Sequence, residues 1–385
     1  MSLRTVTSLL ALTLLAAASS GANAAWAPPG IDLARPRILF RDGDVPALQA
    51  KLGREPYRGI LKDLQRRARA ADGIALDDHA IDSERQKARA AKDLAFLYAI
   101  DRTVVGRDVV PFATPADRTA VGQRVHDLLL AMYTRHRIAV PPPLGGWDRD
   151  ISSSEERLQY ATAYDTMLGA GWDFGAERAA IEQNIVDLAA EMYENFSNPD
   201  TVAGTTRLHQ NNHRAKSGAA MAVAAIAVAE YTPPPGTDPR GVRDPALWLE
   251  YGLDQVDLVM RHVLVTGDGA YGEGPFYLRY ASQNLIPFLR AWDRLVDGAD
   301  WLARGVVVPS LWRHPLWLRT QRWMLDMTLP DGSMAPIDDG NPGRSHYFGI
   351  LPPAPWSGAF AWRWANAPQP LDTDDYAVDD LSRDY

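Results

Sequence analysis

The sequence predicts an all-α protein made of antiparallel helix pairs. Apolar residues recur at the spacing of a helix face through most of the 385-residue chain, and stretches with the alternating pattern of a strand are scarce. Proline-rich loops at 140–143 and 233–236 separate helical stretches. A helix predicted at 214–231 is apolar on nearly every face, which is typical of a helix packed on both sides. A position in an inner ring of helices would explain this pattern, so we predict an incomplete α/α toroid. A helical solenoid is the alternative, but no sequence repeat supports it.

The individual helices are predicted from their apolar faces, taken in chain order. The first sets are Leu94, Leu97 and Tyr98, then Val125, Leu128, Leu129 and Met132, then Ile181, Ile185, Leu188 and Met192. Ser153 and Glu156 have the spacing of a capping box, which predicts the start of a helix over 158–168. Later helices are predicted at 214–231, 246–263, 282–296 and 315–327.

The N-terminus has the pattern of a secretory signal peptide at residues 1–24. Arg4 precedes an apolar run at 9–17, and Ala22-Asn23-Ala24 forms a small-residue site for cleavage before Ala25. We therefore expect a periplasmic or secreted protein. No other apolar run approaches the ~20 residues of a membrane helix, so no membrane contact is expected after signal cleavage.

Composition limits the classes of partner. We expect one large domain over residues 25–370 and an acidic tail at 371–385, because no linker divides the chain. The sequence has no cysteine and therefore neither disulfides nor thiolate chemistry. The net charge of −8 disfavours nonspecific nucleic-acid binding, which needs clustered Lys and Arg. An anionic substrate would need a locally basic site. The oligomeric state is not indicated.

The first candidate cluster is His209-Gln210-Asn211-Asn212-His213, at the start of the alanine-rich helix. Asn is a common N-cap, so helix capping alone is one interpretation. Two adjacent amides and an imidazole exceed the needs of a cap, and they are donors that could neutralise a carboxylate. The spacing of the two histidines also suits a zinc pair, but no Glu stands between them and no Cys is available, so no metal is expected.

The second cluster lies in a glycine-rich stretch, 267–280, that we predict to be a loop. Its reactive side chains are Asp268, Tyr271, Glu273, Tyr277, Arg279 and Tyr280. Interspersed glycines allow the backbone to approach a ligand, and loops often carry function. The alternative is an ordinary turn with aromatic packing. A third stretch, 330–341, contains Asp338 and Asp339 and has the same loop character, or is simply an acidic turn.

These motifs, in this order, resemble the heparinase II/III-like polysaccharide lyases, the superfamily that also contains the toroidal alginate lyases. The resemblance begins at residues 36–40 and 44–48 and continues through 161–168, which includes Tyr164-Asp165. It then runs through Asn-Asn-His, Glu-Gly-Pro-Phe-Tyr and Pro-Asp-Gly-Ser. Members of this family continue into a C-terminal β-sandwich that closes the cleft. We expect the present chain to lack this β-sandwich, with the acidic segment 371–385 leading toward its position, either as a truncated gene product or as a shortened relative.

The resemblance also implies residue roles. It places the catalytic tyrosine at Tyr277 and the groups that neutralise a uronate carboxylate at Asn212 and His213. The implied substrate-binding residues are Gln210, Asn211, Glu273, Arg279, Tyr280 and Tyr271. Arg279, or a protonated His, is expected to stabilise the Tyr277 phenolate, because free tyrosine has a pKa of about 10. No cofactor is expected.

The function that follows from the resemblance is β-elimination in an anionic, uronic-acid-containing polysaccharide or oligosaccharide. One rival is an inverting glycoside hydrolase with Glu273 as acid and Asp338 or Asp339 as base, whose carboxyls would lie about 6.5–9.5 Å apart. Another rival is a non-catalytic glycan-binding toroid. The Asn-Asn-His cluster has no role in hydrolysis and favours the lyase. Alginate, a glycosaminoglycan and a bacterial exopolysaccharide remain equal candidates for the polymer.

Overall fold

The computed structural model describes most of the chain between residues 32 and 337. The described ranges are 32–52, 57–106, 108–132, 146–197, 212–260, 264–265, 268–296, 301–303, 306–308, 310–330, 335 and 337. The predicted signal peptide and acidic tail lie outside them. Helices dominate the described residues, so the all-α class is confirmed, and closure into a toroid stays a prediction.

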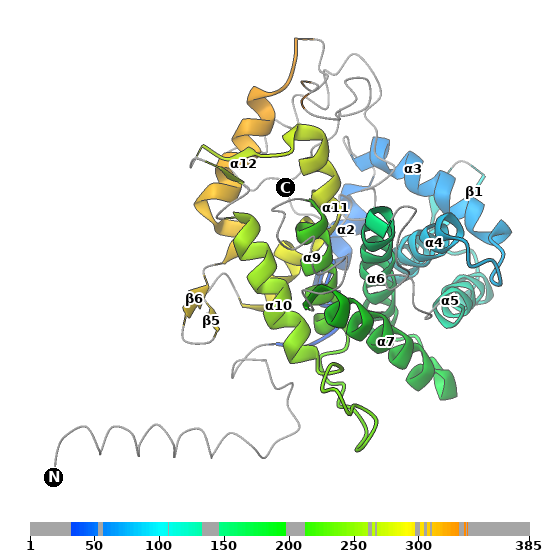
Figure 1. Ribbon diagram of the computed structural model, residues 1–385. Helices are drawn as coiled ribbons and strands as arrows, with labels where there is room; N and C mark the ends of the chain where they lie inside the picture. Colours follow the sequence, from blue (N-terminus) through cyan, green and yellow to red (C-terminus); the bar gives the residue numbers. More distant parts are fainter. Residues whose placement is uncertain are drawn as a thin grey trace.

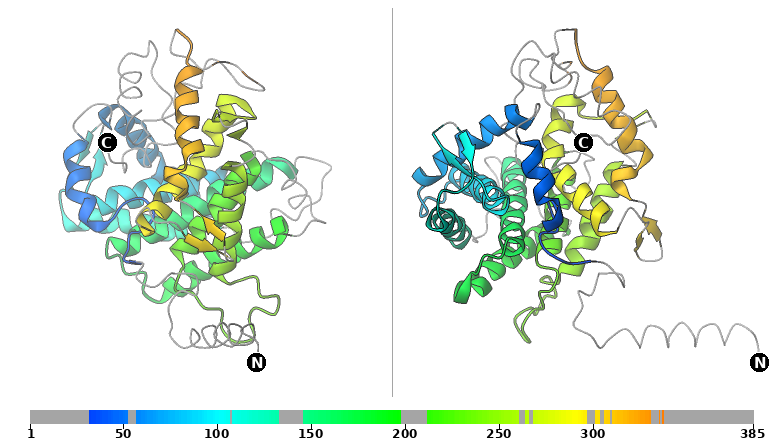
Figure 2. Two further views of the ribbon diagram at one scale, coloured as in Figure 1. Left: turned by 90° about the vertical axis from the view of Figure 1, so that its left-hand side faces the viewer. Right: turned by 180° about the vertical axis from the view of Figure 1, so that it is seen from behind.

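The helices follow one another along the whole described chain (Figure 1). The α-helices are α2 (Val45–Lys51), α3 (Tyr57–Ala70), α4 (Ile81–Ala99), α5 (Pro115–Leu130), α6 (Gly146–Gly169), α7 (Arg178–Ser197), α9 (Asn212–Ala227), α10 (Pro245–Leu258), α11 (Gly274–Leu295) and α12 (Pro315–Asp326). Short 3-10 helices are η1 (Asp42–Asp44), η2 (Ala71–Gly73), η3 (Gly175–Glu177) and η5 (Leu311–Arg313). The right-hand view of Figure 2 shows α3, α4 and α5 on one side of the molecule and α12 on the opposite side.

Strands occur in the described residues only as small antiparallel hairpins. These pair β1 (Thr103–Val105) with β2 (Asp108–Val110), β3 (Leu264–Val265) with β4 (Ala270–Tyr271), and β5 (Trp301–Ala303) with β6 (Val306–Val308). In register, Thr103 lies opposite Val110, Leu264 opposite Tyr271, and Trp301 opposite Val308. The hairpins connect helices and form no sheet on which a core could pack.

Several helices begin where the sequence supplies a proline and a capping side chain. Proline occupies the first helical position of α5, α10 and α12, where its missing N–H costs nothing. Before α5, the Thr114 side chain accepts a hydrogen bond from the Asp117 backbone N–H at 3.2 Å. Before α10, Asp244 accepts from the Ala246 N–H at 2.9 Å.

The predicted apolar faces lie in the core. All the residues of the α4, α5 and α7 sets named above are buried, including Met132 just beyond the end of α5. One hydrophobic cluster contains buried side chains from Ile38 to Met324. The helices predicted at 214–231, 246–263 and 315–327 correspond to α9, α10 and α12 with small shifts at their ends.

The capping box predicted from Ser153 and Glu156 is wrong. Both residues lie inside α6, which already begins at Gly146, and both are buried. Buried polar residues explain the error, because α6 carries Ser, Glu and Arg on faces that pack against other helices. The polar stretch therefore resembled a helix boundary in the sequence.

The loop predicted at 267–280 is also wrong over its second half. Helix α11 begins at Gly274 and not near residue 282, so Tyr277, Arg279 and Tyr280 are helical. Gly274 has a φ of +81°, and a Cβ there would lie 3.0 Å from the Ile337 carbonyl oxygen. A glycine is thus required to turn the chain into the helix, and Pro275 follows within the first turn, where proline is favoured.

Helix α9 lies at the middle of the molecule, packed against α6, α10 and α11 (Figure 1). Its contact with α10 is close because glycines face each other: a Cβ on Gly252 would lie 2.5 Å from the Gly218 carbonyl oxygen. Gly218 also meets Gln255, and Gly252 meets Ala222, so the two helices run antiparallel. Within the described residues, no helix has the length and hydropathy needed to cross a bilayer.

Helices α6, α9 and α11 run parallel to one another. Lys216 of α9 contacts Glu155 of α6, and ten residues further along α9 the Ile226 carbonyl binds Arg37, which is held by Asp165 of α6. Between α9 and α11, Asn212 contacts Glu273 while Lys216 contacts Gln283. Residue numbers therefore rise together along each pair, and the N-terminal ends of these helices lie at the same end of the molecule.

Helix α4 belongs to the same parallel set, and the helices that follow its members in the chain run in the opposite direction. Arg85 of α4 binds Glu155 of α6, and Tyr98 at the end of α4 contacts Trp172 just after α6, so α4 also runs parallel to α6. Helices α5, α7 and α10 follow α4, α6 and α9 in the chain and bring it back to the starting end. Alternation of this kind is what a toroid of helix pairs requires of its inner and outer helices.

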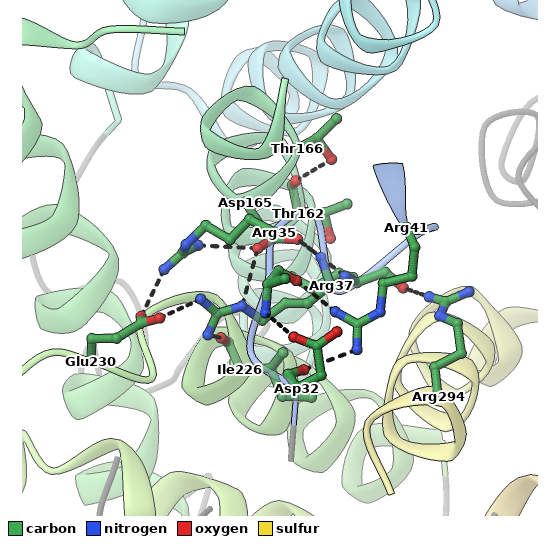
Figure 3. A network of polar contacts seen from close by, with 12 residues as sticks. Asp32, Arg35, Arg37, Arg41, Thr162, Asp165, Thr166, Ile226, Glu230 and Arg294 are labelled. Atoms are coloured by element: carbon green, nitrogen blue, oxygen red, sulfur yellow. Dashed lines mark hydrogen bonds and ion pairs between the residues drawn. The ribbon is translucent and has the colours of Figure 1, made fainter. Parts of the chain in front are cut away.

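The segment before η1 is fixed to the core by charged groups (Figure 3). The buried Asp165 carboxylate accepts the backbone N–H groups of Arg37 and Ile38 at 2.7 and 3.0 Å, and the Arg35 guanidinium at 3.0 Å. Arg35 and Arg37 also bind Glu230 after α9. This network explains why residues 36–40 are buried although they belong to no regular element.

Candidate functional site

The structure describes seven of the nine predicted site residues, namely Asn212, His213, Tyr271, Glu273, Tyr277, Arg279 and Tyr280. Gln210, Asn211, Asp338 and Asp339 lie outside the described residues. The candidate site therefore consists of the first turns of α9 and α11, which lie side by side at the same end of two parallel helices (Figure 1).

Glu273 joins the starts of the two helices. It precedes α11 and accepts the Asn212 backbone N–H on Oε2 at 2.5 Å and the Asn212 side-chain Nδ2 on Oε1 at 2.9 Å. A backbone N–H in the first turn of a helix has no partner within that helix, and Glu273 supplies one. Two clusters 61 residues apart in sequence thus meet through one carboxylate.

Tyr271 supports this carboxylate from inside the protein. It is buried in β4, and its hydroxyl donates to Glu273 Oε2 at 3.1 Å. Burial, followed by the negative charge of Glu273, raises the pKa of the Tyr271 phenol well above its ordinary value. Tyr271 is therefore placed as a neutral donor to Glu273, and this position does not fit the predicted direct contact with substrate.

The Glu273 carboxyl is shifted toward its protonated form. Burial raises its pKa, while the hydrogen bonds from Asn212 and Tyr271 and the charge of His213 act in the opposite direction. Burial prevails because the free-energy cost of removing the carboxylate from water exceeds the stabilisation of the charged form by these donors.

Asn212 does not act as a cap in the predicted sense. Its side chain is 2% exposed, and its Oδ1 accepts no hydrogen bond from the residues that the structure describes. A capping Asn would use this oxygen to accept an N–H of its own first turn. The amide is instead oriented by Glu273, which leaves a buried acceptor at the start of α9.

Tyr277 lies one helical turn after Glu273, on the same side of α11. It is partly buried against the core, and its ring makes an edge contact with Phe276 at a centroid distance of 5.5 Å. Tyr280 follows Tyr277 by three residues and shares this side of the helix. Glu273, Tyr277 and Tyr280 therefore form one row along α11.

Arg279 lies away from that row. Residues two apart on a helix point in nearly opposite directions, so Arg279 and Tyr277 do not face each other. The Arg279 guanidinium lies 5.6 Å from the centre of the Phe276 ring, and the residue is buried. The expectation that Arg279 stabilises a Tyr277 phenolate depended on a flexible loop, and the helix contradicts it.

A buried charge cluster beside the site was missed by sequence reasoning. Lys216 Nζ, one turn after Asn212, donates to Glu155 Oε1 at 2.7 Å, and the other carboxylate oxygen of Glu155 accepts from Arg85 at 2.6 Å. Lys216 Nζ also donates to Gln283 Oε1 at 2.7 Å. The signal in the sequence was a lysine close to Arg214 at the start of a helix that is rich in alanine, and the alanine-rich pattern concealed it.

The Glu155 carboxylate is strongly stabilised in its charged form. Burial raises its pKa, but the charges and hydrogen bonds of Lys216 and Arg85 outweigh burial and bring the value to about 2, from an ordinary 4.5. A carboxyl whose pKa is lower in the folded than in the unfolded state stabilises the fold above the unfolded pKa. That contribution is lost as the pH falls from about 4.5 toward 2.

We expect Glu155→Gln to remove most of this acid-dependent stability. The pKa shift corresponds to on the order of 3 kcal/mol at neutral pH. Urea unfolding at pH 7 and pH 3 measures the free energy of unfolding at each pH. It should fall strongly from pH 7 to pH 3 for the wild type and less for the variant, which is already less stable at pH 7. Glu194→Gln, which breaks an exposed pair with Arg240, is the control and should change stability by less than about 1 kcal/mol. Equal acid sensitivity of wild type and Glu155→Gln would contradict the assignment.

Among the described residues, no group of three or more His, Asp or Glu side chains gathers at metal-binding distance. His209, the possible partner of His213 in a zinc pair, lies outside these residues. Comparison with protein-family models and with curated proteins finds no match to the chain. The fold and site thus define an all-α protein with a polar site at the aligned starts of two central helices.

Proposed function

We propose that the protein is a polysaccharide lyase that cleaves a uronic-acid-containing polysaccharide by β-elimination. The observation that carries the proposal is the contact between Asn212 and Glu273, which brings the Asn-His pair of α9 beside the Glu-Tyr row of α11. The ordered motifs that resemble the heparinase II/III-like lyases support it independently. Neither motif alone contains both a carboxylate-neutralising group and a phenol.

The reaction begins with removal of the proton on C5 of a 4-linked uronic acid. This proton is acidic only because the carboxyl group is attached to the same carbon, and the intermediate would carry two negative charges if that group were not neutralised. His213 and the second N–H of the Asn212 amide, the first being donated to Glu273 Oε1, are the proposed neutralising groups, acting as preorganised donors where negative charge develops. Their position at the start of α9 adds the partial positive charge of the helix N-terminus.

Tyr277 is the proposed base. It lies in the first turn of α11, where the helix dipole favours a negative charge and so assists formation of the phenolate. The phenolate takes the C5 proton, the C4=C5 double bond forms, and the C4–O4 bond breaks. For a syn elimination the resulting Tyr277 hydroxyl then protonates the departing O4 oxygen. The proposed role of Glu273 is to orient Asn212, and the proposed role of Tyr280 is to contact the sugar.

An anionic polymer suits the site although the chain is acidic overall, with a net charge of −8. The parallel direction of α9 and α11 places two positive helix ends together, and His213 lies in the first turn of α9. These groups make the site locally favourable for anions. The signal-peptide pattern agrees with a periplasmic or secreted enzyme that meets such polymers outside the cytoplasm.

An inverting glycoside hydrolase is the second candidate, because one observation favours it. Burial raises the pKa of Glu273, which is the direction that a general acid needs. Against it, both Glu273 oxygens already accept hydrogen bonds from Asn212 and Tyr271. These hydrogen bonds favour a structural role for Glu273, which joins Asn212 to Tyr271, over proton donation to a substrate.

The products distinguish the functions. Elimination leaves an unsaturated sugar that absorbs in the ultraviolet, whereas hydrolysis gives new reducing ends without this absorbance. The unmutated mature protein should be incubated with alginate, heparin and hyaluronan, following absorbance and reducing ends together. A rise in both supports the lyase, and reducing ends alone support the hydrolase. Binding without either product indicates the non-catalytic glycan-binding protein.

A further inference from the structure

We propose that Lys216 is a positioning residue that fixes the ring of Tyr280 as one wall of the sugar-binding site. The inference rests on the proposed function and assigns the buried charge cluster a part in substrate binding. It follows from where the Lys216 ammonium lies, from what it contacts, and from the place of Tyr280 in the Glu273–Tyr277–Tyr280 row.

The Lys216 ammonium is held by a complete set of acceptors. Its Nζ donates to Glu155 Oε1 at 2.7 Å, to Gln283 Oε1 at 2.7 Å and to the Tyr280 backbone oxygen at 3.0 Å. An ammonium has three N–H donors, and each has a partner here. The side chain is fully buried, so its position is well defined.

The same ammonium lies 3.8 Å from the centre of the Tyr280 ring. A cation at this distance from an aromatic face is attracted to it, and the attraction is strongest where both groups are removed from water. Lys216 therefore binds Tyr280 twice, through the backbone oxygen and through the ring. Such a contact restricts the rotation of a ring that is only partly buried and reaches the protein surface.

Lys216 is also joined to the site through both helices that form it. It follows Asn212 by one turn on α9, and its backbone oxygen accepts from Asn284 Nδ2 of α11 at 3.0 Å. Tyr280 follows Tyr277 by nearly one turn on α11. A change at Lys216 should thus disturb the sugar-contacting ring and leave the proton-transferring phenol of Tyr277 in place.

The chain offers a matched control in Lys87. This lysine is likewise fully buried, forms an ion pair with Glu84 at 2.5 Å and donates to the Leu76 carbonyl at 3.0 Å. It belongs to α4, and neither of these two partners is a residue of α9 or α11. Lys87→Met therefore reports what the loss of a buried lysine does to stability alone.

The experiment compares kcat and KM of Lys216→Met, Lys87→Met, Tyr280→Leu and the double variant Lys216→Met/Tyr280→Leu. The substrate is whichever of alginate, heparin and hyaluronan the wild type cleaves fastest. We expect Lys216→Met to raise KM about tenfold with kcat nearly unchanged, the pattern of lost uniform binding. Lys87→Met should leave KM unchanged, and Lys216→Arg should restore part of the wild-type KM.

The double variant tests whether Lys216 acts through the ring. If it does, Lys216→Met adds nothing to the KM of Tyr280→Leu, because the ring is already absent. If the increases in KM of the two single variants multiply in the double variant, the proposal is overturned. It is also overturned if Lys216→Met is less stable than the wild type but has the wild-type KM. Should Lys216→Met not fold, Glu155→Gln/Lys216→Met, which removes both charges of the pair, is compared with Glu155→Gln in the same way.

Failure of the two proposals can be told apart. A wild type that forms no unsaturated product from any of the three polymers overturns the lyase function, and the role of Lys216 with it. A wild type that is active, with the same KM in Lys216→Met, overturns the role of Lys216 alone.

Discussion

Turnover of a uronate polymer by Tyr277→Phe is expected to fall at least ~10²-fold, the lower end of general acid–base contributions. The ring and its packing against the core are retained, so the free energy of unfolding should change by at most about 1 kcal/mol, the net value of one hydrogen bond. The measurement is the initial rate of ultraviolet absorbance, normalised to folded protein.

The physical reason is that the hydroxyl is the only group on this side chain that can transfer a proton. A tyrosine that serves packing alone tolerates phenylalanine, whereas one that removes the C5 proton does not. The place of Tyr277 in the first turn of α11 strengthens this expectation, because the helix N-terminus favours the phenolate there.

Two neighbouring tyrosines are the controls for Tyr277→Phe. Tyr271→Phe removes one donor from Glu273, and Tyr280→Phe keeps the ring over Lys216, so both should retain most of the activity. If Tyr277→Phe is fully active while either control is inactive, the catalytic phenol has been placed at the wrong tyrosine. Full activity of all three variants would contradict the elimination mechanism.

His213→Ala and Asn212→Ala are each expected to lower turnover by about 10²–10³-fold, the usual cost of losing one preorganised donor at a developing charge. The two variants should differ in stability. Asn212→Ala also removes a hydrogen bond to Glu273 and should cost about 1 kcal/mol more than His213→Ala. Turnover is measured by ultraviolet absorbance and stability by urea unfolding of the same preparations.

A buried asparagine outside the site supplies the matched control. Asn195 of α7 donates through Nδ2 to the Glu191 carbonyl at 2.8 Å. Asn195→Ala should lower stability and leave turnover per folded molecule unchanged. If Asn212→Ala behaves like Asn195→Ala, Asn212 only supports the fold and the carboxylate must be neutralised elsewhere.

Helix content and the buried faces followed from the sequence alone. Periodic apolar residues such as Leu94 and Leu97, or Ile181 and Ile185, predicted helices whose core faces the structure confirms. This works because the spacing of a helix face is a local property of the chain. The alanine-rich stretch after Asn212 was likewise predicted as a helix packed on both sides, and α9 is buried along nearly its whole length.

The errors occurred where local signals admit more than one structure. Glycines and Pro275 near Glu273 predicted a loop, but the same residues can begin a helix, and here Gly274 has a φ of +81° and Pro275 lies in the first turn of α11. Ser153 and Glu156 match a capping box by spacing alone. Their burial inside α6 depends on neighbouring helices, which the local pattern does not specify.

Only the tertiary structure decided how the site is assembled. The sequence supplied the groups, including Asn212, His213, Glu273 and Tyr277, and placed them in two separate motifs. The packing of α9 against α11 and α6 brought Glu273 onto Asn212 and buried Lys216 against Glu155 and Tyr280. These contacts join residues about 60 apart in sequence, and the direction and rotation of packed helices, not the local pattern of either one, determine them.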